Sequence, residues 1–289
     1  MRIALGTAQF GLDYGIANTG GKISSDEAAS ILKTALDVGI TTLDTAVGYG
    51  DSEKVLGKVG VERWQIITKL PMYPSHDRNV KSWIRNELYL AMERLKVDRI
   101  FGLLLHRPDQ LLGPHGRDIY QSLIEIKEDG LVEKIGISIY EPDLLDLLIP
   151  KMKIDLVQAP LNVLDRRLIS SGWLRKLYDS GTEVHARSVF LQGLLLMPPE
   201  DRPMQFQHWT TTWNKWDNWL KFNQVSALSG SLAFPLSFKE ISKLVVGVDS
   251  EQHLKQIVDA IGENSALHFP EDIVSVDQNL INPSLWRLE

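Results

Sequence analysis

The chain has 289 residues, of which 44% are hydrophobic and 24% are charged, and its formal net charge is −6 at pH 7. This length and composition suit one large α/β domain or two small ones, with a sizeable core. The acidic balance and the lack of a Lys/Arg-rich run exclude a basic footprint for nucleic acid. The absence of cysteine excludes a disulfide framework and thiolate metal ligands.

The histidines and the N-terminus indicate further kinds of site and segment that the protein is not expected to have. The seven histidines show no HExxH-type spacing, so no metal site is expected. The opening run MRIALGTAQFG is too short for a signal segment and predicts a first strand, and no run reaches the length of a membrane span. We therefore expect a soluble protein of a reducing compartment, most simply the cytoplasm, without nucleic-acid or membrane partners. The oligomeric state does not follow from the sequence.

Short apolar runs alternate with amphipathic stretches along the chain. The first helix opens with Ser25 and stops at Gly39, as expected from helix-start and helix-stop residues. In chain order the predicted strands cover 2–7, 41–44, 64–69, 100–106, 134–139, 155–160, 182–188 and 243–248. The other predicted helices run from Ser52 to about Gly57 and over about 80–95, 116–129, 142–150, 167–179 and 250–261.

This alternation predicts the fold class. Eight strands, each followed by a helical segment, favour a closed parallel (β/α)8 TIM barrel that forms a single α/β domain over residues 1–289. An open doubly wound sheet is the alternative. That fold normally carries GxGxxG after its first strand, and the sequence TAQFGLDYG lacks it.

Residues 205–223, QFQHWTTTWNKWDNWLKFN, hold four of the eight tryptophans. Trp209, Trp213, Trp216 and Leu220 fall on one helical face, which predicts a stripe packed on the core. The alternative is an aromatic wall over a binding site, because the segment follows the seventh predicted strand on the loop side of a barrel.

Polar side chains stand where consecutive predicted strands end. They are Asp44, Tyr49 on the loop that follows, Lys69 and His106. The C-terminal strand ends of a parallel barrel meet at one face, so these groups are expected to lie together. A tyrosine holds its proton at neutral pH, and a nearby ammonium favours its ionisation. Such a site can protonate an oxygen on which negative charge develops, as the reduction of a carbonyl by hydride requires.

The chain resembles the aldo-keto reductase family over nearly its full length. Residues 44–57 match the family motif D-x-x-x-x-Y-G-x-S-E-x-x-L-G, and ITK at 67–69 and LLLHRPD at 103–109 follow in the family order. The resemblance implies a barrel that reduces an aldehyde or ketone with NAD(P)H. It implies Tyr49 as the general acid, Lys69 as the group that makes Tyr49 more acidic, Asp44 as the partner of Lys69, and His106 as the residue that orients the carbonyl.

The resemblance also implies a set of cofactor contacts. Ser138 and Gln158 would hold the nicotinamide carboxamide, although Ile139 replaces the family's Asn. Arg187 occupies the position at which an aromatic ring stacks on the nicotinamide. The remaining contacts are Ser188, Leu191 and Gly193 for the pyrophosphate, and Gly247, Ser250 and His253 for the adenosine end.

The choice of cofactor depends on the segment after the last strand. The family leans to NADP(H), which we expect here, with NAD(H) as the alternative. Asp249 and His253 stand where the family places basic residues for the 2′-phosphate, so we expect discrimination to be weaker than usual. If Asp249 caps the helix and faces solvent, the family preference stays in force.

Several functional alternatives stay open. The same chemistry can run in the oxidative direction as a sugar or alcohol dehydrogenase, and a cofactor-bound regulatory protein of low turnover belongs to a different class. The substrate is expected to be a small-molecule carbonyl compound. Residues 72–79, residues 113–117 and the Trp-rich segment are expected to shape its pocket, because specificity in such barrels lies in loops.

Overall fold

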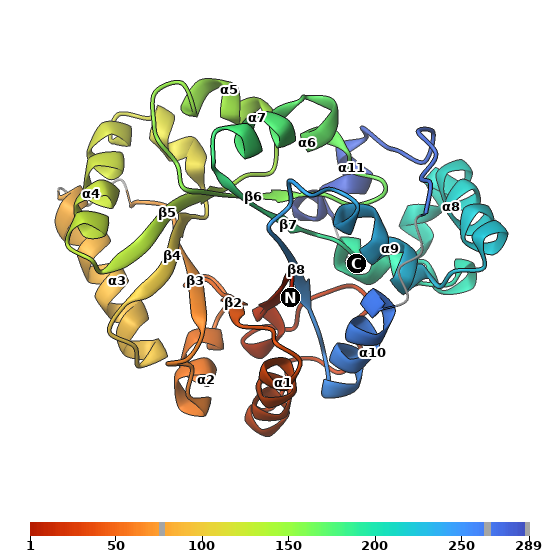
Figure 1. Cartoon of the computed structure of the whole chain (residues 1–289), viewed down its shortest axis with the longest axis horizontal. Helices are drawn as coiled ribbons and strands as arrows, with labels where there is room; N and C mark the ends of the chain where they lie inside the picture. The colour runs from red at the N-terminus through yellow and green to blue at the C-terminus, as the bar shows by residue number, and fades with distance from the viewer. Residues whose placement is uncertain (75–78, 263–266, 287–289) are drawn as a thin grey trace.

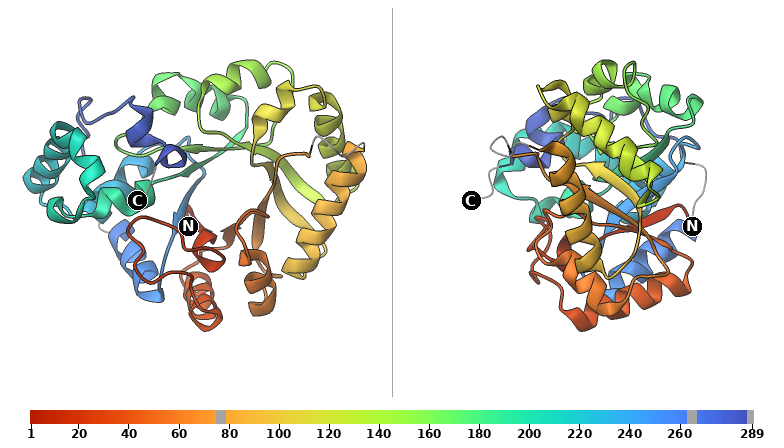
Figure 2. Two further views of the ribbon diagram at one scale, coloured as in Figure 1. Left: turned by 180° about the vertical axis from the view of Figure 1, so that it is seen from behind. Right: turned by 90° about the vertical axis from the view of Figure 1, so that its left-hand side faces the viewer.

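The computed structural model describes residues 1–74, 79–262 and 267–286. Its strands pair in parallel and in sequence order around a closed barrel, β1-β2-β3-β4-β5-β6-β7-β8. The strands are β1 Ile3–Gly6, β2 Thr42–Asp44, β3 Gln65–Leu70, β4 Ile100–Leu105, β5 Val132–Ser138, β6 Leu156–Pro160, β7 Glu183–Arg187 and β8 Lys243–Gly247. The predicted (β/α)8 TIM barrel is confirmed, and the helices form a ring outside the strands (Figures 1 and 2).

The helices follow the strands along the chain. They are α1 Ser25–Asp37, α2 Ser52–Val59, α3 Val80–Leu95, α4 Gly116–Glu128, α5 Asp143–Leu148, α6 Arg167–Ser170, α7 Trp173–Asp179, α8 Thr210–Asn223, α9 Ala227–Leu236, α10 Glu251–Gly262 and α11 Gln278–Ile281. Side-chain caps set several of their starts: Ser24 accepts from the Glu27 amide, and Asn79 accepts from the Ser82 amide. Within the described ranges, no helix combines the length and apolar character needed to cross a membrane.

Two helix predictions differ from the structure. The single helix predicted over 167–179 is two helices, α6 and α7, because Gly172 between them has a left-handed backbone with φ 76°. The second helix between β7 and β8, α9, was not predicted. Its sequence ALSGSLAFPL is apolar on all sides, so it carries no amphipathic signal, and most of its residues are buried.

The Trp-rich segment forms a layer outside the barrel, and the prediction of a core stripe is the one the structure supports. Helix α8 lies at the outer edge of the molecule (Figure 1), and it packs on α9, where Gly230 lets the rings of Trp216 and Trp219 approach closely. Trp213 and Trp216 of the predicted stripe are buried, and so is Trp219, which was not part of it, whereas Trp209 and Leu220 are half-buried against the core. The indole N–H groups of Trp213, Trp216 and Trp219 each donate to a backbone carbonyl, those of Phe206, Leu195 and His268 respectively.

The barrel interior places the site at its C-terminal end. Side chains of a strand alternate between the inside and the outside of the barrel, so Ile67 points inward with Lys69. Ile67, Leu104 and Leu156 form a small apolar cluster separate from the main core. The pairing register sets Gly6 beside both Asp44 and Gly247, and Ser138 beside Gln158, so the predicted site residues share one rim.

Candidate active site

Asp44 and Lys69 form a buried ion pair at the ends of β2 and β3. The Lys69 Nζ lies 2.6 Å from Asp44 Oδ1, and the Lys69 side chain is fully buried. The ammonium also donates to the Thr45 carbonyl at 2.9 Å. Burial acts to lower the pKa of Lys69, but the attraction of Asp44 and Tyr49 outweighs it and raises the pKa above its ordinary value. Lys69 is therefore a fixed positive charge.

Tyr49 lies on the loop after β2, with its hydroxyl 3.4 Å from Lys69 Nζ. A left-handed Gly50 (φ 56°) sets the loop, and a Cβ there would lie 2.5 Å from the Gly11 carbonyl oxygen. The hydroxyl of Ser52 donates to the Thr7 carbonyl at 2.8 Å, which ties the start of α2 to β1. The glycine and the serine of the 44–57 motif thus hold Tyr49 at the barrel mouth.

His106 follows β4 and faces the tyrosine. Its ring meets the Tyr49 ring edge-on, with centroids 5.9 Å apart. Burial, helped by the positive charges of Lys69 and Arg187, lowers the pKa of His106 to about 4. At neutral pH the imidazole is uncharged and has one N–H group. It can therefore donate a hydrogen bond to a substrate oxygen, but it has no additional proton to transfer as an acid.

Gln158 is joined to the same carboxylate. Its Nε2 donates to Asp44 Oδ2 at 2.7 Å, while Lys69 occupies Oδ1. The Gln158 Oε1 lies 3.5 Å from the Ser138 hydroxyl. These contacts fix which end of the amide faces Asp44, and they leave an acceptor oxygen next to a hydroxyl on the cavity side of β5 and β6.

A cavity of about 330 Å³ joins these groups to the start of α10. Most of the predicted site residues line it: Asp44, Tyr49, His106, Ser138, Gln158, Arg187, Ser188, Gly193, Gly247 and His253. Lys69 lies behind Asp44. Leu191 is fully buried, and the Ser250 hydroxyl accepts from the His253 amide as the cap of α10. Leu191 and Ser250 are therefore not part of the cavity wall.

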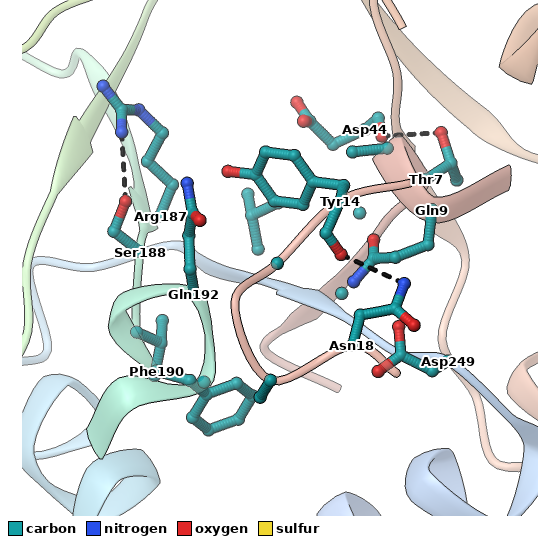
Figure 3. Close-up of a pocket in the computed structure, with 18 of the residues that line it drawn as sticks. Thr7, Gln9, Tyr14, Asn18, Asp44, Arg187, Ser188, Phe190, Gln192 and Asp249 are labelled. Carbon is teal, nitrogen blue, oxygen red and sulfur yellow. Dashed lines mark hydrogen bonds between the residues drawn. The ribbon is translucent and has the colours of Figure 1, made fainter. Parts of the chain in front are cut away.

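The loop between β1 and α1 forms a wall that the sequence interpretation missed. Tyr14 lies across the cavity, between Arg187 and Gln192 on one side and Asp44 on the other (Figure 3). Asn18 folds this loop, since its side-chain oxygen accepts from two backbone amides and its nitrogen donates to the Tyr14 carbonyl. The length of the Gly-rich stretch between the first strand and the first helix was the available signal.

The loops predicted to shape the pocket do not do so within the described part of the chain. Residues 75–78 of the 72–79 stretch lie outside the described residues, and neither the others nor 113–117 line the cavity. Tyr73 and His115 instead pack on each other, with ring centroids 5.1 Å apart. The tryptophans of 205–223 are likewise absent from the described cavity wall.

A strained turn after β7 forms another part of the wall. Ser188, Leu191 and Gln192 have left-handed φ values of 58°, 49° and 54°, a conformation that costs free energy for residues with a Cβ. A Cβ at Gly193 would lie 2.4 Å from the Cβ of Ala17, so only glycine lets the β1–α1 loop rest on this turn.

Asp249 faces the far end of the cavity. Its Oδ1 is buried without a hydrogen-bond partner among the described residues, and burial raises the pKa of its carboxyl. The nearest basic side chain is His253, whose Nδ1 lies 3.9 Å from Oδ2. Lys255 pairs with Glu251 at 2.6 Å. The expectation that Asp249 faces solvent is therefore not supported.

Comparisons with known proteins show the family of the chain. The profile of the Aldo/keto reductase family matches residues 2–272. D-threo-aldose 1-dehydrogenase of Pseudomonas sp. is 27% identical over 312 aligned residues, covering 92% of this chain and 92% of that protein. L-galactose dehydrogenase of Arabidopsis thaliana is 25% identical, covering 91% of this chain and 86% of the relative.

Solved structures show the same fold. An aldo-keto reductase from Bacillus halodurans in its holo form superposes with a TM-score of 0.73 at 20% identity, covering 92% of this chain and 88% of that chain. A glycerol dehydrogenase from Gluconobacter oxydans gives a TM-score of 0.68 at 21% identity with the same coverage. The profile match spans nearly the whole chain, and the chain belongs to the aldo/keto reductase family of oxidoreductases.

Proposed function

We propose that the chain reduces an aldehyde or ketone to an alcohol with a nicotinamide dinucleotide, and that Tyr49 donates the proton. The observation that carries this proposal is the buried ammonium of Lys69, held 2.6 Å from Asp44 and 3.4 Å from the Tyr49 hydroxyl. When the phenol gives up its proton, that ammonium stabilises the phenolate left behind.

The carbonyl oxygen has two donors in this arrangement. Neutral His106 donates a hydrogen bond that orients it, and the Tyr49 hydroxyl transfers a proton as negative charge develops on it. Asp44 holds Lys69 in place and balances its charge. In the oxidative direction the same groups act in reverse, with the Tyr49 phenolate as base, so an alcohol or sugar dehydrogenase is the second candidate. The names of the two dehydrogenase relatives favour it.

The cavity fits a dinucleotide cofactor, which supplies the hydride when it is bound. The Ser138 hydroxyl offers a donor and the Gln158 Oε1 an acceptor for the carboxamide beside the catalytic groups. Gly193 and Gly247 line the same cavity and pack on this chain's own side chains, those of Ala17 and Gln9. The cavity then continues past Ser188 to Asp249 and His253.

The sequence predicts NADP(H) as the cofactor, with NAD(H) as the alternative. We propose that the protein discriminates only weakly between the two. In the described chain, the Asp249 end of the cavity wall contains no lysine or arginine. A carboxylate there disfavours a phosphate dianion, whereas it can accept hydrogen bonds from a ribose hydroxyl. We expect NADH to be used with a kcat/KM comparable to that of NADPH.

Tyr49→Phe tests the proposal. It should lower kcat by about 10²- to 10⁴-fold, the usual contribution of general acid catalysis. The cofactor concentration that half-quenches the protein fluorescence should stay the same as in the wild type. Tyr120→Phe is the matched control, since it also removes a hydrogen-bonded hydroxyl, here 2.8 Å from the Lys153 amide and outside the cavity. Turnover of a reactive aldehyde by Tyr49→Phe at near the wild-type rate would remove Tyr49 from the mechanism. Cofactor binding without any turnover by the wild type would favour the regulatory alternative.

A further inference from the structure

Arg187 gives the cavity a permanent positive charge that no carboxylate balances. Lys69 is matched by Asp44, but within the described ranges Arg187 takes part in no ion pair, and its hydrogen bonds go to neutral acceptors. An arginine stays charged at all working pH values, and a half-buried charge without a counter-ion is unfavourable. A bound anion would relieve this cost.

The guanidinium is held in place by its surroundings. Its Nη2 donates to the Ile139 carbonyl at 2.9 Å, its Nη1 donates to the Ser188 hydroxyl at 3.0 Å, and its plane lies over the Tyr140 ring at 4.4 Å. A guanidinium has five N–H donors, so others are left for a ligand. The contacts to Ile139, Ser188 and Tyr140 set the orientation of the group before a ligand arrives and leave its charge unchanged.

The charge acts at the end of the cavity where the carbonyl is expected. Arg187 is among the groups that keep His106 uncharged, whereas the carboxylate of Asp249 belongs to the opposite end. Tyr14 lies beside Arg187 with its hydroxyl toward the amide of Gln192 (Figure 3). A hydroxyl, an amide and a guanidinium therefore stand together near Tyr49 and His106, a set of donors suited to carboxylate or phosphate oxygens.

We propose that Arg187, with Tyr14 and Gln192, forms an anion-binding subsite beside the reacting carbonyl, so that the substrates are aldehydes or ketones that carry a carboxylate or phosphate group. This inference rests on the proposed carbonyl reduction and adds the substrate class to it. The same guanidinium could instead meet the pyrophosphate of the cofactor, and the experiment separates these two sources of negative charge.

The test compares two substrates of similar shape, 4-carboxybenzaldehyde and methyl 4-formylbenzoate. The wild type should prefer the carboxylate by about 10- to 100-fold in kcat/KM, the range of one charge-assisted contact. Arg187→Met should remove most of that preference, so that kcat/KM falls at least about tenfold further for the carboxylate than for the ester, and the dissociation constants of NADH and NADPH report any contact of Arg187 with the cofactor. Arg107→Met is the control, because it deletes an exposed arginine next to His106 that pairs with Asp109.

Other results would overturn the inference. Equal use of both aldehydes by the wild type excludes an anion subsite for the substrate. An equal loss of both activities in Arg187→Met, with weaker cofactor binding, assigns the guanidinium to the cofactor phosphates. If the wild type reduces neither aldehyde, the proposed function fails. Calorimetry with 4-(hydroxymethyl)benzoate and its methyl ester then tests separately whether the anion-binding subsite exists. Binding of the carboxylate alone, lost in Arg187→Met, upholds it, and equal binding of both overturns it.

Discussion

The two ends of strand β7 treat charge in opposite ways. At the N-terminal end, Glu183 accepts hydrogen bonds from Lys134 and from His185, which lies 2.9 Å away and is fully buried. At the C-terminal end, the acceptors of Arg187 among residues 1–74, 79–262 and 267–286 are all neutral. Burial acts to raise the pKa of Glu183, but the contacts with His185 and Lys134 outweigh it and lower the pKa to about 2. Glu183 at the barrel bottom is thus paired within the protein, whereas Arg187 at the mouth has no counter-ion among the described residues.

This contrast predicts which substitutions cost stability and which cost activity. Substitutions at the bottom of the barrel should change only the free energy of unfolding. Substitutions at the mouth should change the catalytic rate constants. Lys69 is the exception, because it is fully buried and also contacts Tyr49, so its substitution should change both stability and rate.

Lys69→Met should have the largest effect. It leaves the buried Asp44 carboxylate without its cation, at a cost of about 3–5 kcal/mol of stability, and turnover should fall nearly as far as in Tyr49→Phe. Urea unfolding and steady-state kinetics measure the two effects. The double variant Asp44→Asn/Lys69→Met removes the stranded charge, so it should recover stability without recovering turnover. Recovery of both would make the pair purely structural.

Glu183→Gln should lower stability by about 1–3 kcal/mol, the range for hydrogen bonds to a charged group that is only half-buried, with kcat/KM unchanged. The pH dependence gives a second test. Because the folded pKa of Glu183 is about 2 and the ordinary value is 4.5, the wild type gains this stability above pH 4.5 and loses it as the pH falls toward 2. The variant should lack that portion of the acid transition. A changed KM in Glu183→Gln would break the division between the two ends.

Trp213→Phe tests whether the tryptophan layer contributes to stability and not to substrate binding. The indole N–H donates to the buried Phe206 carbonyl at 2.8 Å, and its loss leaves that oxygen unpaired, at a cost of about 1–3 kcal/mol. Differential scanning calorimetry should show the lower melting temperature, and KM should not move. A raised KM with unchanged stability would revive the aromatic wall that the sequence left open.

Asp249→Asn should have the smallest effect, confined to cofactor choice. Removing the negative charge should raise the ratio of kcat/KM for NADPH to that for NADH about tenfold, or about 1.4 kcal/mol. Paired kinetics at low salt check this, and Asp259→Asn on helix α10, which follows Asp249, serves as the control for a general change of charge. An unchanged ratio would place the 2′-phosphate away from Asp249.

The sequence predicted the strands well because each is a short apolar run bounded by polar or glycine residues. Helix α3 was predicted with its observed bounds, 80–95, since its amphipathic pattern follows directly on the capping residue Asn79. The groups at the strand ends were also predicted, because a parallel barrel must collect them at one face.

What the sequence did not predict depends on contacts between distant segments. Tyr14 enters the cavity only because its loop folds through Asn18 and rests on Gly193, a contact that no local pattern announces. The inward direction of Asp249 is likewise a matter of packing. The break at Gly172 was missed because the apolar spacing continues across it.

The two oxygens of Asp44 tie together groups that serve different reactants. One oxygen holds Lys69, which contacts Tyr49, the proposed proton donor, and the other holds Gln158, the proposed contact of the nicotinamide. Under the proposed function, the donor of the proton and the binding site of the hydride donor would therefore share one carboxylate. Substitutions at Lys69 and Gln158 should therefore be energetically coupled, with a double-mutant cycle that departs from additivity by about 0.5–3 kcal/mol, although the two side chains are proposed to serve different reactants.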